Sequence, residues 1–336
     1  MTVDSDHCGT DGARFGTFVT HRDSESLIAA VAARTSRPNA GIFGPHSVSW
    51  KINRESALFL GAGRAALLQL AHPWVAAALA HHSSLLADPI ARFHNTFRVV
   101  FTIVFGSLDQ ALAAARRLYA LHTLVRGEIP EDAAGWRRGS PYEANEIAAL
   151  RWVYATLVES AVLAYECVFP ATPDGRGGLT ATERERYYTE SRTMAALFGI
   201  PAAALPENWE AFAAYNRQMH VSEELGVSND ARAMAHKLLA GAGSWIRPPF
   251  WYRALTTEWL PERFRSEFDL EFGAREQRAV HLARLRLPRI YRKLPHVVRF
   301  TGPWREAQAR LAGRSIDVLT RLSNRFWIGQ PLLPFA

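Results

Sequence analysis

Apolar positions along the chain recur at a spacing of three or four residues, which is the periodicity of an amphipathic helix. Helix start signals accompany this pattern. Asp88-Pro89 opens a segment that ends at Gly106, and Ser107 with Gln110 forms a capping box for the next segment, which ends at Gly127. No series of alternating apolar and polar residues indicates strands. The pattern therefore predicts an all-α fold.

Further helices are predicted at residues 26–34, 146–169 and 206–219 and in the segment that Thr180 and Glu183 cap and Gly199 ends. The segment 146–169 is apolar on most sides, which indicates a central position. Residues 65–80 carry no formal charge, but they are too few to span a membrane comfortably. We expect them to form a buried helix.

Residues 61–66 read Gly-Ala-Gly-Arg-Ala-Ala and fit the dinucleotide-binding fingerprint GxGxxA. That motif requires a preceding strand and an acidic residue about 20 positions later. No acidic residue follows until Asp88, and no βαβ series is present. Close packing of helices at small residues is the favoured interpretation.

The composition is that of a globular protein. The chain has 336 residues, 48% of them hydrophobic and 21% charged, which excludes a disordered or collagenous protein. Cys8 and Cys167 cannot form a disulfide framework, and no CxxC pair exists. The N-terminal residues lack a signal-peptide pattern. We expect a cytoplasmic protein in a reducing compartment.

Positive charge is concentrated near the C-terminus. The net charge is +7, and residues 275–325 contain thirteen lysines and arginines against Glu276, Glu306 and Asp317. Composition changes near Leu239. We therefore predict an N-terminal segment at 1–39, a large helical domain at 40–240, and a basic helical appendage at 241–336 that packs on it.

The basic region allows three interpretations. Its arginines could attract anionic lipids in a peripheral membrane contact, with nearby aromatic residues at the interface. These aromatic residues are Trp245, Phe250, Trp251, Tyr252 and Trp259. As a nucleic-acid surface it lacks a recognised module, and no nucleic acid is expected. Ordinary solvated helix faces are the favoured interpretation.

Several catalytic motifs are missing from the sequence. There is no HExxH, no Glu-x-x-His pair, no GxSxG and no Walker A loop. His81 and His82 are neighbours and would point to different sides of a helix. A zinc or di-iron site built from protein ligands alone has little support.

Arg92, Thr96 and His122 are the remaining candidates. Arg92 and Thr96 are spaced i, i+4 and share one helix face, while His122 lies on the apolar stripe of the next predicted helix. If the two helices are antiparallel neighbours, the three residues meet in the interior. A buried imidazole beside a guanidinium stays neutral, and neutral imidazole ligates iron. On chemistry alone, a core histidine and a surface arginine would be favoured.

Glu159 lies among apolar residues of the predicted central helix, including Trp152, Val158 and Val162. A buried carboxylate requires a partner. We expect Glu159 to form an internal ion pair rather than to act as a catalytic base.

Six blocks of the sequence, in order, resemble the MpaB-like/rubber oxygenase family, which includes the latex clearing proteins. The blocks are residues 67–83, 88–106, 121–127, 151–166, 185–201 and 205–216. The resemblance covers roughly residues 40–240.

This resemblance implies an all-α domain that encloses a haem b, in an oxygenase that cleaves carbon–carbon double bonds of isoprenoid chains. It implies that His122 is the proximal iron ligand and that Arg92 and Thr96 line the haem pocket. A single imidazole ligand leaves the sixth iron position open for O₂, and a guanidinium can meet a haem propionate or polarise bound oxygen.

The sequence also departs from the family. Latex clearing proteins have a lysine directly before the threonine, where this chain has Asn95. They carry a distal glutamate, but no acidic residue lies between Glu55 and Asp88. His72, His81 or His82 could contribute in its place. Rubber is therefore not the expected substrate, and an intracellular apolar molecule fits better.

The leading hypothesis is a haem b-dependent oxygenase that uses O₂ on an apolar, isoprenoid-like or alkene substrate. The alternative is a non-catalytic haem- or lipid-binding protein that keeps the family fold, and it is motivated by the missing distal acid. A helical interaction module without a cofactor is the third hypothesis.

Overall fold

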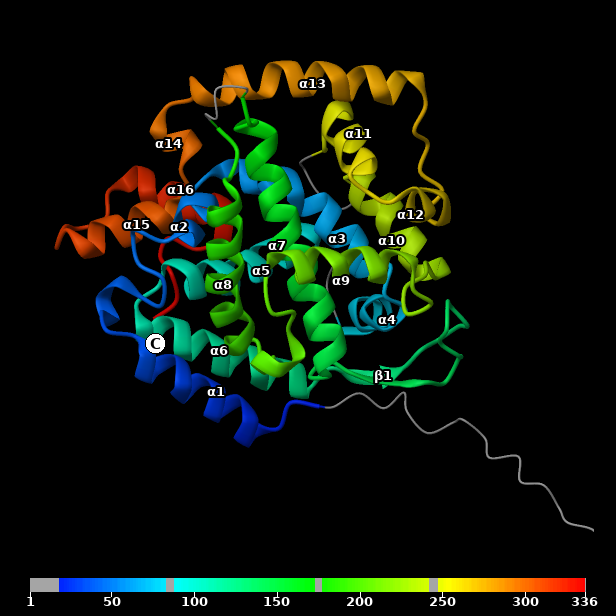
Figure 1. Cartoon of the computed structure of the whole chain (residues 1–336), viewed down its shortest axis with the longest axis horizontal. Coiled ribbons are helices and arrows are strands. Elements are labelled where there is room, and N and C mark those ends of the chain that lie inside the picture. The colour runs from blue at the N-terminus through cyan, green and yellow to red at the C-terminus, as the bar shows by residue number, and fades with distance from the viewer. Residues whose placement is uncertain (1–17, 83–87, 173–176, 242–246, 336) are drawn as a thin grey trace, which may run out of the picture.

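The computed structural model describes residues 18–82, 88–172, 177–241 and 247–335, and helices dominate these residues (Figure 1). The α-helices are α1 (His21–Arg34), α2 (Val48–Asn53), α3 (Ala62–Leu70), α4 (Pro73–His82), α5 (Pro89–Phe105), α6 (Leu108–Thr123), α7 (Ile147–Val168), α8 (Ala181–Leu197), α9 (Trp209–Val221), α10 (Asn229–Ala240), α11 (Phe250–Glu258), α12 (Glu262–Glu267), α13 (Ala274–Arg292), α14 (His296–Arg299), α15 (Gly302–Leu311) and α16 (Val318–Ile328). Three 3₁₀ helices are η1 (Pro38–Ala40), η2 (Ser56–Gly61) and η3 (Ala202–Ala204). The all-α prediction is confirmed.

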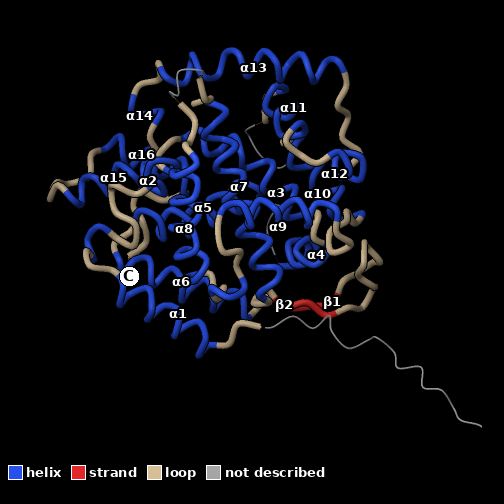
Figure 2. Tube along the Cα trace, in the orientation of Figure 1, coloured by secondary structure: helices blue, strands red, loops and turns tan. Residues whose placement is uncertain are grey.

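A small antiparallel hairpin is the exception to the helical pattern. Strand β1 (Arg126–Glu128) pairs with β2 (Pro141–Glu143), and Gly127 lies opposite Tyr142. Figure 2 shows this pair at one edge of the molecule, next to helices on its inner side. The buried Tyr142 of β2 packs against Trp74 of α4 and Ala149 of α7.

The helix starts follow the local sequence signals. The Asp88 side chain accepts a hydrogen bond from the Ala91 amide at 2.9 Å and caps α5. The Ser107 and Gln110 side chains each accept a hydrogen bond from the other residue's backbone amide at the start of α6. These caps satisfy amide donors that the first helical turn leaves free. Helices α5 and α6 then pack against each other across the short Gly106-Ser107 connection.

The prediction of one buried helix over residues 65–80 is wrong, because the structure divides it into two. Helix α3 ends at Leu70, and α4 begins at Pro73. Proline has no amide hydrogen and disfavours the helical conformation of the residue before it, so Pro73 favours a break in the helix at His72. The chain therefore changes direction between the end of α3 and the start of α4.

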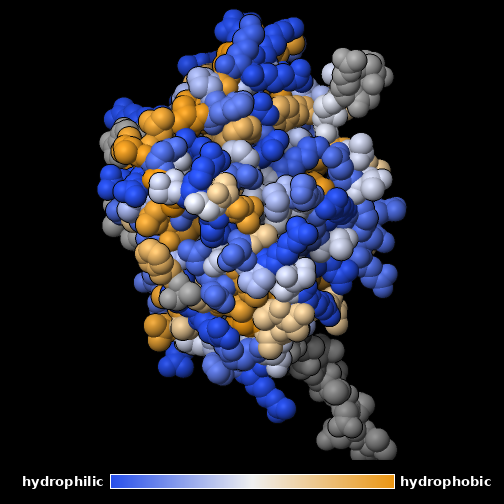
Figure 3. Space-filling view, turned by 90° about the vertical axis from the view of Figure 1, so that its left-hand side faces the viewer, coloured by the Kyte–Doolittle hydropathy of each residue, from blue (hydrophilic) through white to orange (hydrophobic). Residues whose placement is uncertain are grey.

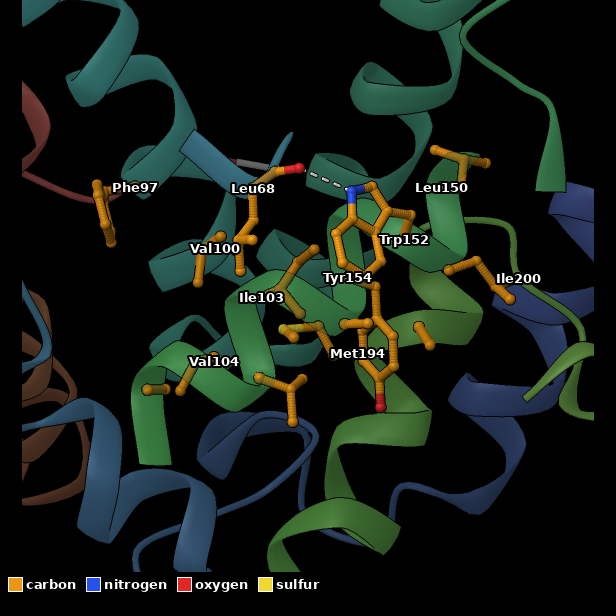
Figure 4. Close-up of a cluster of buried hydrophobic side chains, with 14 of the residues drawn as sticks. Leu68, Phe97, Val100, Ile103, Val104, Leu150, Trp152, Tyr154, Met194 and Ile200 are labelled. Carbon is orange, nitrogen blue, oxygen red and sulfur yellow. Dashed lines mark hydrogen bonds between the residues drawn. The ribbon is translucent and has the colours of Figure 1, made fainter. Parts of the chain in front are cut away.

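Helix α7 lies in the centre of the core, as predicted for residues 146–169. Its Trp152 is buried and donates an indole hydrogen bond to the Leu68 carbonyl at 2.9 Å (Figure 4). Of the described helices, α7 is also long and apolar enough to cross a membrane, but 61% of its most apolar window is buried inside the protein. Such burial is typical of a core helix.

Close packing at glycine explains the GxGxxA-like segment. A Cβ atom on Gly61 would lie 2.5 Å from the Ser160 carbonyl oxygen of α7, and one on Gly63 would lie 2.7 Å from the Thr256 hydroxyl of α11. Neither neighbour leaves room for a methyl group. The favoured interpretation, close helix packing at small residues, is confirmed.

Glu159 forms the ion pair that its apolar surroundings predicted. The Arg64 guanidinium donates to Glu159 and, at 2.9 Å each, to the Ser160 hydroxyl and the Trp259 carbonyl. The Glu159 side chain is 24% exposed, whereas a second paired carboxylate, Glu55, is 1% exposed and accepts hydrogen bonds from Arg299. Both carboxylates hold elements together rather than facing a cavity.

The helices after residue 240 pack onto those before it. Helix α13 contacts α7 and α11, while α15 and α16 contact each other and α5. In Figure 1, α13 lies across the top of the molecule and α15 and α16 lie at its left. The predicted domain limits at residues 40 and 240 stay a prediction.

Candidate active site

A cavity of about 520 Å³ lies among η2, α3, α5, α10, α11 and α16. Its wall is mainly apolar, and aromatic side chains from three separate elements make up much of it: Phe59, Phe93, Phe97 and Trp327. The volume falls in the range of about 300–1,000 Å³ that is common for small-molecule and cofactor sites. The cavity is therefore the principal candidate for a binding site within the described residues.

Phe59 holds the aromatic wall together. Its ring stacks on Trp327 with centroids 3.8 Å apart and planes 2° from parallel. It also meets Phe97 edge-on at 4.6 Å and Phe93 at 5.2 Å. Offset and edge-on ring pairs of this kind are favourable and rigid. The cavity consequently has a fixed, water-excluding side.

Most polar groups in the cavity wall already have partners inside the protein. The Thr96 hydroxyl donates to the Arg92 carbonyl at 3.1 Å, and the Gln69 amide donates to the Thr156 hydroxyl at 3.0 Å. The Tyr252 hydroxyl accepts from the Gly63 amide and donates to the Phe59 carbonyl. These groups shape the wall and leave little hydrogen-bonding capacity for a ligand.

Arg92 is different from these polar groups. It lines the cavity, and its guanidinium donates no hydrogen bond to any residue that the structure describes. Enclosure by protein lowers the pKa of the Arg92 guanidinium below its ordinary value, although the group remains a cation at neutral pH. A cation in such a place is costly without an anionic partner. Arg92 therefore marks a position where an anionic group would be stabilised.

His122 lies near Arg92, at the C-terminal end of α6. Its Nδ1 atom is buried and has no hydrogen-bond partner among the described residues. Burial, and to a smaller extent the positive charge of Arg92, lower the pKa of His122 to about 4. The imidazole is thus neutral at physiological pH. His122 is not among the residues that line the cavity. Arg92 lines the cavity and also lies close enough to His122 to affect its pKa.

The three histidines considered as substitutes for a distal acid lie elsewhere. His81 contacts the Tyr142 hydroxyl, and His82 contacts the carbonyl of Arg126 in strand β1. His72 is buried beside the rings of Trp74 and Trp136. None of them lines the cavity. No carboxylate appears in the described part of its wall either, because Glu55 is paired with Arg299.

The aromatic residues expected at a membrane interface are distributed differently. Trp245 lies outside the described residues. Tyr252 lines the cavity, while Phe250, Trp251 and Trp259 are partly buried among neighbouring helices.

Sequence reasoning missed Phe59, Tyr252 and Trp327 as cavity residues. The spacing of Phe93 and Phe97, four residues apart on α5, could have indicated an aromatic face. Nothing local predicts that Trp327, near the C-terminus, stacks on Phe59. Within the described residues, no group of three or more His, Cys, Asp or Glu side chains could hold a metal ion by itself.

These features define an all-α protein with an apolar chamber whose described wall carries Arg92 and the solvent-exposed Arg325, neither of which donates to a described residue. A family model described as "ER-bound oxygenase mpaB/B'/Rubber oxygenase, catalytic domain" matches residues 50–300 of the chain. The chain belongs to this family, and the class of protein is accordingly an oxygenase catalytic domain that uses O₂ on a small-molecule substrate. No curated protein and no solved structure matched the chain.

Proposed function

We propose that this protein is a haem b-dependent oxygenase, with the haem held between the start of α5 and the end of α6. The observations that carry the proposal are the buried Nδ1 of His122, which has no hydrogen-bond partner, and the partly buried Arg92 guanidinium beside it, which donates to no described residue. Buried polar groups without partners are rare in native proteins and point to a missing ligand or ion. A haem offers a partner to each of them.

His122 fits the role of the iron ligand. Iron is ligated by a neutral imidazole nitrogen, and the pKa of about 4 keeps the ring neutral across the physiological range. The position at the end of α6 is enclosed, which limits competition from water. The family resemblance assigns the same residue to the same role.

Arg92 fits the role of a propionate partner. Haem carries two carboxylates, and a guanidinium binds a carboxylate through strong, charge-assisted hydrogen bonds. Such a bond would compensate the enclosed cation that the described protein residues leave unpaired. Thr96 lies one turn further along α5, and its hydroxyl is held by the Arg92 carbonyl. Thr96 therefore shapes the pocket next to the arginine.

When bound, haem iron supplies the capacity to bind and activate O₂. The chain supplies the surroundings. The aromatic wall around Phe59 excludes water and orients an apolar substrate, and Arg92 places a positive charge at the edge of the chamber. We propose an alkene-containing, isoprenoid-like molecule as the substrate, with oxidative cleavage of a carbon–carbon double bond as the reaction that the family implies.

A specific observation favours the alternative, a haem- or lipid-binding protein without turnover. No carboxylate in the described wall of the cavity could accept or release a proton during oxidation. Asn95, which stands at the position of the family's lysine, is exposed and does not line the cavity. Beside Arg92 the described wall includes one histidine, His94, whose Nε2 lies 3.0 Å from the Phe326 carbonyl oxygen, so the chamber can bind an apolar molecule while offering few groups that could move a proton.

The first test is the absorption spectrum of the purified protein, with haem quantified per chain. We expect a Soret band at about one haem per chain, and we expect His122→Ala to lose it. His81→Ala is the control, since His81 lies on α4 and contacts Tyr142 instead. Full haem retention in His122→Ala would contradict the ligand assignment.

A second measurement separates the two functions. Oxygen uptake is recorded after addition of an apolar alkene to the haem-loaded protein. An oxygenase consumes O₂ with the alkene, whereas a carrier binds the alkene and leaves O₂ unchanged.

A further inference from the structure

Helix α16 packs with its apolar side facing outward. Its buried positions are Thr320 at 3% exposure, Asn324 at 0% and, at the C-terminal end, Ile328 at 0%. Its outer face carries Val318 at 69%, Leu319 at 57%, Leu322 at 52% and Phe326 at 50% exposure. A surface helix ordinarily buries its apolar stripe and exposes its polar one. In α16 this arrangement is largely reversed.

Hydrogen bonds fix the helix in this orientation. The inward Asn324 amide donates to the buried Glu306 carboxylate at 2.6 Å and to the Pro331 carbonyl at 3.1 Å. Glu306 in turn accepts the Leu333 amide at about 3.0 Å. Rolling α16 to bury its leucines would break these bonds and leave a buried carboxylate with fewer partners. The outward orientation of the apolar face is thus fixed by tertiary hydrogen bonds.

Basic residues accompany the apolar face. Arg321 and Arg325 are exposed and lie along one border of the stripe formed by Val318, Leu322 and Phe326. The acidic residue nearest to the stripe, Asp317, accepts the Thr320 amide as the cap of the helix. In Figure 3 the side of the molecule that carries α15 and α16 faces the viewer, and hydrophobic patches there lie among hydrophilic ones.

The same helix forms part of the cavity wall. Trp327 stacks on Phe59 inside the cavity, and Phe326 lines the cavity while half of its side chain is exposed. Phe326 therefore lies both at the opening of the cavity and in the apolar stripe. Residues 318–327 also lie outside the segment that the family model matches. The stripe leads directly to the chamber.

We propose that α16 docks on an anionic lipid bilayer, with Val318, Leu319, Leu322 and Phe326 among the acyl chains and Arg321 and Arg325 at the headgroup phosphates. An apolar stripe bordered by arginines is the pattern of a helix that lies in a membrane interface. The cavity then opens toward the bilayer, where an apolar substrate is concentrated. Only this last step, the supply of substrate, rests on the proposed function.

A second copy of the chain could also cover the stripe, but it fits less well. It would close the cavity opening at Phe326 and bring the arginines of two subunits together. A bilayer covers the stripe, attracts the arginines and leaves the opening in contact with apolar molecules.

The test measures binding of the purified full chain to vesicles by flotation. We expect the protein to bind vesicles of phosphatidylcholine with phosphatidylglycerol, and to bind vesicles of phosphatidylcholine alone at least tenfold less. The variant Leu319→Asp/Leu322→Asp should lose binding to the mixed vesicles at least tenfold, because it places two carboxylates in the stripe. The matched control is Val221→Asp, at an apolar position on α9 that is 78% exposed, and it should bind like the wild type.

Three results would overturn the proposal. They are no binding of the wild type to the mixed vesicles, an equal loss in the Val221→Asp control, and a dimer in sedimentation velocity that Leu319→Asp/Leu322→Asp dissociates while vesicle binding is absent. All substituted positions are exposed, so thermal unfolding should confirm that the variants fold. His122→Ala should bind vesicles like the wild type, which separates failure of the haem assignment from failure of this proposal.

Discussion

Two arginines enclosed by the protein, Arg64 and Arg92, have opposite surroundings. Arg64 is 3% exposed and distributes its donors over Glu159, Ser160 and the Trp259 carbonyl. Arg92 donates to no described residue and lies beside the similarly unpaired His122. An enclosed charge with complete protein partners stabilises the fold, whereas one without partners identifies the place of a ligand.

The same contrast applies to carboxylates near the two arginines. Glu159 and Glu55 each have an arginine partner, Arg64 and Arg299 respectively. These two carboxylates therefore stabilise the fold. Arg92, which is partly buried, and the exposed Arg325 are the arginines that line the chamber, and neither pairs with a described carboxylate.

The largest effect is expected for Arg64→Met. Removal of the guanidinium leaves the buried Ser160 hydroxyl, the Trp259 carbonyl and the partly exposed Glu159 carboxylate without their partner. The loss of three hydrogen bonds from a charged donor costs about 3–5 kcal/mol of unfolding free energy. Urea unfolding measured by circular dichroism checks this value. A loss below about 1 kcal/mol would mean that the Arg64 network contributes little to stability.

A smaller effect is expected from pH acting on the buried His72. Burial lowers the pKa of His72 from 6.5 to about 4, so the unfolded chain binds a proton that the folded chain rejects between these values. The unfolding free energy should fall as pH drops from 6.5 to 4, and His72 contributes about 3 kcal/mol of this fall. His72→Phe keeps an aromatic ring beside Trp74 and Trp136 but cannot titrate.

Urea unfolding at pH 7 and pH 4.5 tests this expectation. The loss of stability on acidification should be smaller in His72→Phe than in the wild type. Equal losses in the two proteins would show that His72 takes up its proton as easily folded as unfolded.

The sequence predicts those features of the Arg64 and Arg92 surroundings that depend on neighbouring residues in the chain. Asp88 and the Ser107–Gln110 capping box define where α5 and α6 begin, because caps depend on neighbours within three residues. These two boundaries place Arg92 and His122 at adjacent helix ends. The position of Glu159 among apolar residues likewise predicts that its carboxylate has a partner. It does not identify that partner as Arg64.

The remaining features depend on contacts between distant segments. The stacking of Trp327 on Phe59 and the outward turn of the α16 leucines cannot be derived from periodicity. Periodicity identifies an apolar stripe but not the side of the helix that packs. In α16 the hydrogen bond from Asn324 to Glu306 fixes which side of the helix packs inward, and this bond forms only in the tertiary structure.

The smallest effect on stability is expected for Arg92→Met. This variant tests the comparison of Arg92 with Arg64 most directly. In the haem-free protein the substitution removes an enclosed cation that has no partner, so the unfolding free energy should stay within about 0.5 kcal/mol of the wild type or rise. Haem binding should weaken in the same variant, because a propionate would lose its guanidinium.

Titration of the haem-free protein with haem, followed by the Soret absorbance, measures this second effect. Arg92→Lys serves as the matched control, since it keeps the charge and loses the planar, two-pronged geometry of the guanidinium. A destabilisation of Arg92→Met as large as that of Arg64→Met would show that Arg92 has a structural partner after all. Unchanged haem affinity with unchanged stability would remove Arg92 from the pocket and leave His122 as the sole anchor of the proposed site.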